Sequence, residues 1–450
     1  MKSKFINGIA KYKKDSLIKG FSVLLSGTVL TQIISLLLSP ILTRLYTPEQ
    51  YGINSIYISL LTIFGVFATL RFQSAIAISN SHYERKALSK VAAYSSIIIS
   101  IFIFILLLLT RDWIFVKLNL PNDNWLLMLL PISILFLGIY EILFQNLLSH
   151  NKYKSMVKIS MVKVATQGLS QIIFAFAQLD YLGLIIGNLI SYIFPVIIMS
   201  SIMLKESKNK PKVTLVKDEY FSIVRKYIDF PRYALPSHLI NIASYSLIPI
   251  VIAILFSAEV AGYYALANRL INIPISAFGN SLRQVYLREA STELSNTGNI
   301  KSAFFKTSKI LLIISLPCAI VLFVFGPVFF RIVFGEEWGI SGVYVQTLIL
   351  LFISRLIFAP LISTVNIIGK QRTGLIVSGG LLLSLLLISF IFGYFHLKEI
   401  YLFFILISVS YTLVYCLFYF FIYKLIKGEY IDYEVKKDNS TNDNSTNTSE

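Results

Sequence analysis

Charged residues are scarce in this sequence. They make up 14% of its 450 residues, whereas 56% of the residues are hydrophobic and the mean hydropathy is +0.72. A soluble protein of this composition would have too little polar surface to cover its core. The sequence therefore excludes an ordinary soluble domain and predicts a protein embedded in lipid.

Cysteine and histidine are also scarce. Both cysteines, Cys318 and Cys416, lie inside apolar runs, so the sequence indicates neither a disulfide framework nor a metal cluster. The four histidines are scattered along the chain, and we find no paired carboxylates or nucleophile–histidine pair. The glycines of a phosphate loop are missing as well. These absences predict that the protein is not an enzyme and binds no metal or other cofactor.

Long apolar runs are abundant. Runs of about 20 residues are long enough to cross a bilayer as helices, whereas open strands would leave backbone groups unpaired in lipid. The sequence therefore predicts an all-α polytopic membrane protein with about twelve spans. The runs cover approximately residues 20–43, 54–79, 91–110, 125–149, 156–178, 181–204, 233–256, 262–287, 307–330, 342–367, 373–395 and 399–424.

Lysine and arginine are unevenly distributed between the predicted loops. When basic residues toward the ends of runs are counted with the loops that they adjoin, 32 of the 40 lie at the termini and in every second loop, 5 lie in the alternate loops and 3 lie deeper within runs. The positive-inside rule then places both termini in the cytoplasm. Attraction of this basic surface to anionic lipid headgroups explains the net charge of +17. No nucleic acid is needed as a partner.

Two segments 210 positions apart share an aromatic residue, a hydroxyl residue, Glu and Gly in register. They read Tyr46-Thr47-Pro48-Glu49-Gln50-Tyr51-Gly52 and Phe256-Ser257-Ala258-Glu259-Val260-Ala261-Gly262. The repeat indicates two pseudo-symmetric six-helix lobes, which in transporters usually move about a site at their interface. We predict a basic cytoplasmic N-terminus, an N-terminal lobe, a cytoplasmic linker, a C-terminal lobe and a disordered cytoplasmic tail, at residues 1–19, 20–204, 205–232, 233–425 and 426–450.

Ionisable side chains inside the predicted spans are few. Each costs about 2.5 to 3.5 kcal/mol at the centre of a helix in lipid, so such residues usually face a polar cavity. Arg71, Arg269, Arg355 and Arg283 are therefore candidates to line a cavity between the lobes and bind a phosphate or diphosphate. The alternative is that they snorkel to an interface or pair with backbone carbonyls or with Glu141. Glu141 could bind a proton or Na⁺ or could neutralise an arginine, and we favour neutralisation.

Amide and hydroxyl side chains in the same runs are a second set of candidates. They would line the cavity and hydrogen-bond a hydroxylated substrate, or they would hold helices together, and for any one residue we favour the second role. The set contains Gln32, Gln73, Asn146, Asn241 and Asn268, and in addition Thr31, Gln145, Gln167, Gln171, Asn272 and Gln346.

The first repeated segment belongs to a longer pattern at the end of the first run. The pattern is Arg44-Leu45-Tyr46-Thr47-Pro48-Glu49-Gln50-Tyr51-Gly52, and the next run begins Ile53-Asn54. With the twelve-span layout, it resembles the polysaccharide-exporter branch of the multidrug/oligosaccharidyl-lipid/polysaccharide (MOP) flippases, the Wzx-like O-antigen and capsule-repeat translocases. The resemblance extends over about residues 20–425.

The resemblance implies a MATE-like, V-shaped bundle that flips undecaprenyl-diphosphate-linked oligosaccharide across the bacterial inner membrane by alternating access. It also implies a cationic central cavity for the diphosphate, for which Arg71, Arg269 and Arg355 are the candidates. The implied partners are the lipid-linked glycan, membrane lipids and other membrane proteins of polysaccharide assembly. The implied pathway is the synthesis of O-antigen, lipopolysaccharide, capsule or a similar glycan.

Three other functions remain as alternatives. A membrane-embedded polysaccharide polymerase or ligase would use the same substrate, but such enzymes usually have a sizeable outer loop, and the largest here is about residues 111–124. A MATE-type multidrug antiporter usually has an acidic residue in its first membrane helix, and the first predicted span, 20–43, has none. A major-facilitator carrier also has twelve spans, but residues 81–86 lack the glycine-bounded basic turn expected between its second and third spans. The sequence therefore favours the flippase.

Overall fold

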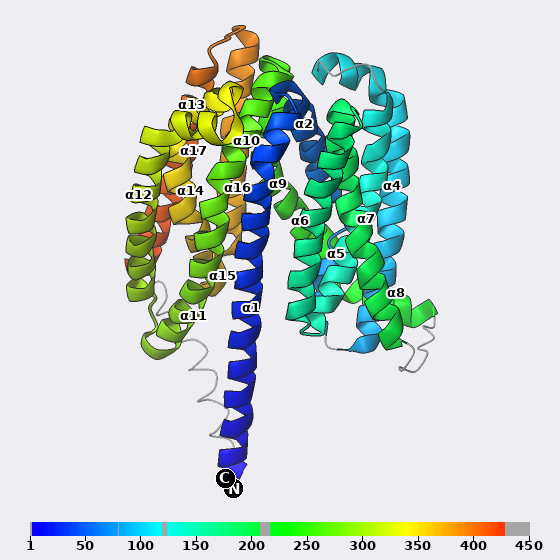
Figure 1. Cartoon of the computed structure of the whole chain (residues 1–450). Helices are drawn as coiled ribbons and strands as arrows, with labels where there is room; N and C mark the ends of the chain where they lie inside the picture. Colours follow the sequence, from blue (N-terminus) through cyan, green and yellow to red (C-terminus); the bar gives the residue numbers. More distant parts are fainter. Residues whose placement is uncertain (1, 80, 119–123, 208–216, 428–450) are drawn as a thin grey trace. The chain divides into compact units, whose positions relative to one another are not determined.

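The chain is almost entirely helical (Figure 1). The computed structural model describes residues 2–79, 81–118, 124–207 and 217–427, and among these residues we find no β-strand. The all-α prediction is therefore confirmed. The predicted tail beyond residue 427 and residues 208–216 of the predicted linker lie outside the described residues.

The chain divides into two compact units. Unit 1 contains the described residues up to Ala265 and a second segment, Val333–Trp338, and unit 2 contains the other described residues. The helices of unit 1 are α1 (Lys2–Leu45), α2 (Pro48–Gly65), α3 (Phe72–Ile78), α4 (His82–Leu118), α5 (Asn124–Ser149), α6 (Tyr153–Phe176), α7 (Asp180–Ser207), α8 (Lys217–Lys226), the π-helix η1 (Phe230–Ala234), α9 (Leu235–Leu255) and the 3₁₀ helix η3 (Glu336–Trp338). Within this unit α6 lies against α1 and α7, and α5 lies against α4 and α7.

Unit 2 begins within α10 (Ala258–Pro274), whose first turns belong to unit 1. Its other elements are the π-helix η2 (Ile275–Gly279), α11 (Asn280–Thr297), α12 (Lys301–Phe334), α13 (Gly339–Thr347), α14 (Ile349–Leu361), α15 (Thr364–Ile367), α16 (Gln371–Tyr394) and α17 (Ile400–Lys427). In this unit α17 lies against α13, α14 and α16. The six-and-six division into lobes stays a prediction.

Nine helices among the described residues are long and apolar enough to cross a membrane. The number becomes ten when the bent pair Glu336–Thr347 and Ile349–Leu361, which meet at 58°, is counted as one span. A multi-pass membrane protein is thus confirmed, but the count of twelve is not. The two predicted spans that are missing, 54–79 and 262–287, are both interrupted in the structure.

The two interruptions have different causes. In the first, α2 ends at Gly65 and the chain turns before Phe72, with φ angles of 48° at Leu70 and 64° at Arg71. Residues other than glycine seldom adopt this left-handed conformation, which ends a right-handed helix. In the second, Pro274 closes α10 and the π-helix η2 follows it. Proline has no N–H to donate and crowds the preceding turn, which favours the change from α-helix to π-helix at this position.

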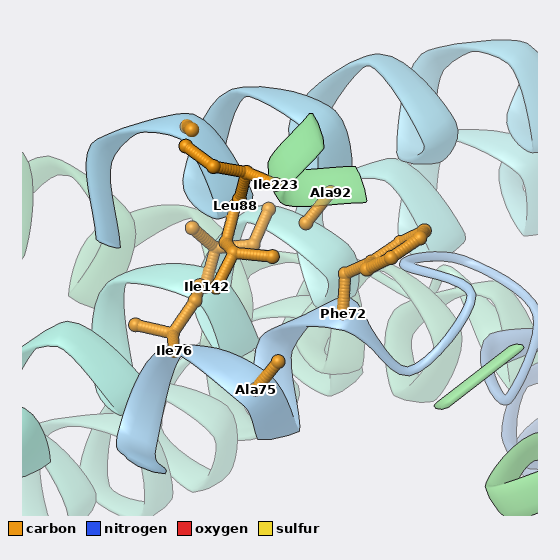
Figure 2. Close-up of a cluster of buried hydrophobic side chains, with 8 residues drawn as sticks. Phe72, Ala75, Ile76, Leu88, Ala92, Ile142 and Ile223 are labelled. Carbon is orange, nitrogen blue, oxygen red and sulfur yellow. The ribbon is translucent and has the colours of Figure 1, made fainter. Parts of the chain in front are cut away.

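The part of the predicted linker that the structure describes packs onto unit 1. Ile223 of α8 lies in a buried cluster with side chains of α3, α4 and α5 (Figure 2). The other members of the cluster are Phe72, Ala75, Ile76, Ala87, Leu88, Ala92 and Ile142. Burial of an aliphatic side chain of this size contributes about 1.5 to 3 kcal/mol. The amphipathic helix α8 is therefore an integral part of unit 1.

Polar contacts fix the end of α8 on α4, one of the three helices that it contacts in the cluster. Lys226 Nζ lies 2.6 Å from a carboxylate oxygen of Glu84, and the hydroxyl of Tyr227 donates to the other oxygen at 3.0 Å. The hydrogen bond to Glu84 raises the pKa of Lys226. Lys226 therefore stays protonated at neutral pH.

The two repeated segments meet in unit 1. A Cβ atom added to Gly52 of α2 would lie 1.7 Å from the carbonyl oxygen of Ala258, and one added to Gly262 of α10 would lie 1.8 Å from that of Pro48. Each glycine therefore allows the backbone of the other helix to approach closely. Both helices also start alike, because the Thr47 and Ser257 hydroxyls accept hydrogen bonds from the backbone three residues further on.

Trp338 joins this crossing from the segment 333–338. Its side chain is 1% exposed, and its indole N–H donates to the carbonyl oxygen of Thr43 at 2.9 Å. The ring meets Tyr51 and Tyr263 edge to face, with centroids 5.1 and 5.9 Å apart. Tyr51 of the repeated motif thus has a packing role here.

We expect Gly52→Ala and Gly262→Ala each to destabilise the protein by about 1 to 3 kcal/mol or more, because the new methyl group would overlap a backbone carbonyl. Gly379→Ala is the matched control, since nothing lies within 4 Å of a Cβ at that helical position. Thermal unfolding of the purified protein in detergent measures the effect. Equal melting temperatures for all three variants would contradict the close crossing.

Candidate functional site

Four ionisable side chains come together inside the predicted spans of unit 1. Arg71 lies in the turn before α3, Glu141 on α5, Lys163 on α6 and His238 on α9. All four side chains are half-buried. Glu141 interacts electrostatically with both Lys163 and Arg71, and Arg71 also interacts with His238. The structure therefore assembles Arg71 and Glu141, as the sequence suggested, and adds two residues to them.

Lys163 is held between two tyrosine rings. Its Nζ lies 4.2 Å from the ring centroid of Tyr192 on α7 and 4.8 Å from that of Tyr140 on α5. A cation over an aromatic face gains about 2 kcal/mol or more when both groups are desolvated. Tyr140 directly precedes Glu141, so the same turn of α5 supplies one ring and the carboxylate. These contacts fix the ammonium group close to Glu141.

Sequence reasoning missed Lys163. The charge pattern groups it with the basic loop after residue 149, although it lies inside the predicted run 156–178. The structure starts α6 at Tyr153 and places Lys163 ten residues into the helix. The position inside the run was the available signal. A lysine that deep in a span is too far from the helix end to be read as a loop residue.

Arg71 has an unusual backbone and an unsatisfied donor. It is the residue before α3, in the left-handed conformation, and its buried Nε has no hydrogen-bond partner within the part of the chain that the structure describes. An unpaired buried donor costs free energy, more so when the group is charged. Arg71 therefore keeps one hydrogen-bond donor that the described part of the chain does not use.

The other three arginines belong to unit 2. Arg269 lies on α10 and Arg355 on α14, and both are half-buried, whereas Arg283 on α11 is exposed. α11 and α14 are in contact within the unit. Arg71 belongs to unit 1, so a cavity shared by all four arginines stays a prediction. The predicted equivalence of Glu141 and Arg355 in depth also stays a prediction.

Several polar candidates have partners inside their own unit. The Thr69 hydroxyl donates to the side chain of Gln73, and the amide of Asn146 donates to the Ser89 hydroxyl and to the Ile142 carbonyl, both at 2.9 Å. In unit 2, Asn272 donates to Asn268, and Gln346 donates to the Phe323 carbonyl at 2.6 Å. Gln32 is half-buried and Asn241 is exposed. A role for these side chains in a cavity stays a prediction.

A chain of amides links three helices of unit 1. Gln167 of α6 donates to Asn188 of α7 at 2.5 Å, and Asn188 donates to Asn54 of α2 at 2.7 Å. One turn along α6, the side-chain amide of Gln171 donates to a backbone carbonyl of α7 at 2.9 Å. The backbone carbonyl of Gln171 accepts a hydrogen bond from the Tyr46 hydroxyl at 2.7 Å. These contacts favour the helix-holding role for Gln167 and Gln171.

Comparison with known proteins identifies the family. The family described as "Polysaccharide biosynthesis protein" matches residues 41–341, which is more than half of the chain and includes the repeated motif, Arg71, Glu141 and Lys163. The chain belongs to this family. The predicted resemblance to polysaccharide exporters is thereby confirmed.

A curated relative in the same area of metabolism is teichuronic acid biosynthesis protein TuaB of Bacillus subtilis (strain 168). It is 25% identical to the chain over 137 residues, which are 30% of this chain and 28% of TuaB. The matched stretch thus spans less than a third of the relative's length.

Solved structures show the fold. Lipid II flippase MurJ in an inward closed conformation matches with a TM-score of 0.68 and 18% identity, covering 89% of this chain and 87% of MurJ. A MATE multidrug-resistance transporter of the MOP superfamily, facing inward, matches with a TM-score of 0.64 and 14% identity over 90% and 96% of the two chains. The Vibrio cholerae MATE transporter VcmN in its bent form matches with a TM-score of 0.55 and 18% identity, covering 92% of this chain and 97% of VcmN. This family member therefore has the predicted MATE-like fold, which it shares with MurJ and the MATE transporters.

We expect Asn188→Leu to destabilise the protein by roughly 0.6 to 2 kcal/mol, because it removes both hydrogen bonds of the amide chain. Gln32→Leu is the control, since no such chain includes Gln32, and its melting temperature should stay near that of the wild type. Thermal unfolding in detergent compares the two variants. A larger loss for Gln32→Leu than for Asn188→Leu would contradict the assignment.

Proposed function

We propose that this protein is a flippase that moves an oligosaccharide linked to undecaprenyl diphosphate across the bacterial inner membrane. The observation that carries the proposal is the charge of the unit 1 cluster: two cations, Arg71 and Lys163, interact with a single carboxylate, Glu141. In a chain of a polysaccharide biosynthesis family with a flippase-like fold, this excess of positive charge suits an anionic lipid-linked glycan.

Guanidinium groups are appropriate ligands for a diphosphate. Their planar, forked N–H donors bind phosphate oxygens in pairs and stay charged at all relevant pH values. We propose that Arg71, Arg269 and Arg355 provide these donors, with Arg283 nearer the surface. The glycan would occupy a polar chamber between the lobes while the prenyl chain stays in lipid, and rocking of the lobes would expose the chamber to each side in turn. The glycan would be an O-antigen, capsule or similar repeat unit.

Two alternatives make different predictions. A polymerase or ligase would extend or transfer the glycan, so incubation of purified protein with lipid-linked oligosaccharide would give longer chains. A drug antiporter would bind cations, for which an acidic residue in the first helix is expected, but the span Ser26–Leu45 has none. The excess of cations in unit 1 would repel such a substrate.

We expect Arg71→Ala and Arg355→Ala each to reduce translocation at least about tenfold, since each loses a charge-assisted hydrogen bond of about 1.5 to 3 kcal/mol. Arg288→Ala, at an exposed position on α11, is the matched control and should translocate normally. Proteoliposomes containing a fluorescent lipid-linked oligosaccharide measure the rate as protection from an external quencher. Wild-type rates in both test variants would show that these arginines do not belong to the site. Extension of the oligosaccharide would show that the protein is an enzyme and not a flippase.

We also propose that both termini lie in the cytoplasm, from the distribution of basic residues. In a parent with Cys318→Ser and Cys416→Ser, we expect Glu49→Cys to react with a membrane-impermeant maleimide in intact cells. Lys154→Cys should react only after permeabilisation. Both positions are exposed in the structure. The reverse labelling pattern would show that the protein has the opposite orientation in the membrane.

A further inference from the structure

In the unit 1 cluster, the two cations interact with Glu141 to different extents. Of the two cations that interact with Glu141, Lys163 has the stronger electrostatic effect on the carboxylate and Arg71 the weaker one. One carboxylate has one charge to compensate, so a second cation beside it remains largely uncompensated. Pairing of Glu141 with Lys163 therefore leaves Arg71 available.

Geometry favours this division. Lys163 is confined by the faces of Tyr140 on α5 and Tyr192 on α7, two helices that contact each other as well as α6. Lys163 also makes a side-chain hydrogen bond with Tyr192, but a tyrosine hydroxyl is a neutral partner, so Glu141 is the carboxylate that interacts with the ammonium group. Arg71, in contrast, lies in the turn between α2 and α3, and its buried Nε is unsatisfied among the described residues.

We infer that Lys163 is a positioning residue: it holds the charge of Glu141 and thereby keeps the guanidinium group of Arg71 available for the diphosphate of the substrate. The inference rests on the proposed function. It predicts that Lys163 acts through Glu141 and does not contact the substrate. Without Lys163, Glu141 would pair with Arg71 and compete with the diphosphate for it.

The test measures binding of undecaprenyl diphosphate to the purified full-length protein in detergent, with undecaprenol as the neutral probe. We expect Lys163→Met to weaken binding of the diphosphate about tenfold, within the usual range for coupled sites. The double variant Lys163→Met/Glu141→Gln should recover to within about threefold of the wild type, because the competing carboxylate is gone. Lys163→Arg, which keeps the charge and the ring contacts, should bind almost normally. Undecaprenol should bind equally to all variants.

Each other outcome has a distinct meaning. If Lys163 contacts the substrate itself, the double variant will bind as weakly as Lys163→Met, and the inference is wrong. If Lys163 is only structural, the melting temperature will fall while the affinity of the folded protein stays unchanged, which also contradicts the inference. Should Lys163→Met fail to fold, Glu141→Gln alone decides, because the inference requires it to bind at least as tightly as the wild type.

A further variant separates this inference from the proposed function. Arg71→Ala should lose diphosphate binding whatever the role of Lys163. If Arg71→Ala binds normally, the proposed anion site is wrong. If Arg71→Ala loses binding but the double variant does not recover, only the positioning role of Lys163 is wrong.

Discussion

Backbone groups that cross lipid must be hydrogen-bonded within the chain, and this requirement connects the helix interruptions with the arginines. The three interrupted spans are those that carry Arg71, Arg269 and Arg355. Arg71 lies in the turn between α2 and α3, Arg269 precedes the π-helix η2, and Arg355 follows the bend between α13 and α14. An interruption is tolerated where protein or water surrounds the freed backbone groups. An intramembrane arginine needs the same surroundings, so at each interruption a local polar environment would account for both features.

Close backbone approach provides the second constraint. Lipid offers no hydrophobic driving force between helices, so association depends on tight packing and interhelical hydrogen bonds. Gly52 and Gly262 provide the tight packing, and Trp338 covers the crossing from a segment far along the chain. The sequence repeat therefore corresponds to a contact between its two copies, because each copy supplies a glycine that lets the backbone of the other approach.

The sequence predicted the helical class and the positions of ten spans, because hydropathy alone determines which segments are long and apolar enough to cross lipid. It did not predict the break before Phe72, since apolar residues continue through the turn and the left-handed φ angles leave no compositional trace. The sequence predicts two of the four residues of the unit 1 cluster. Arg71 and Glu141 are conspicuous as charges in apolar runs, whereas Lys163 was grouped with a basic loop, and its ring partners lie on two other helices.

The assignment of Lys163 to a span also affects the electrostatic argument for function. Moving one lysine out of the loops that are predicted to be cytoplasmic leaves the strong excess of basic residues there, so the predicted orientation is unaffected. The same lysine changes the interior, because Arg71 and Glu141 alone would form a neutral pair with no preference for an anion. With Lys163 the cluster has a net positive charge in a region where every charge must be compensated. A cationic drug would increase that imbalance and a diphosphate would remove it, which is the electrostatic basis of the proposed flippase function.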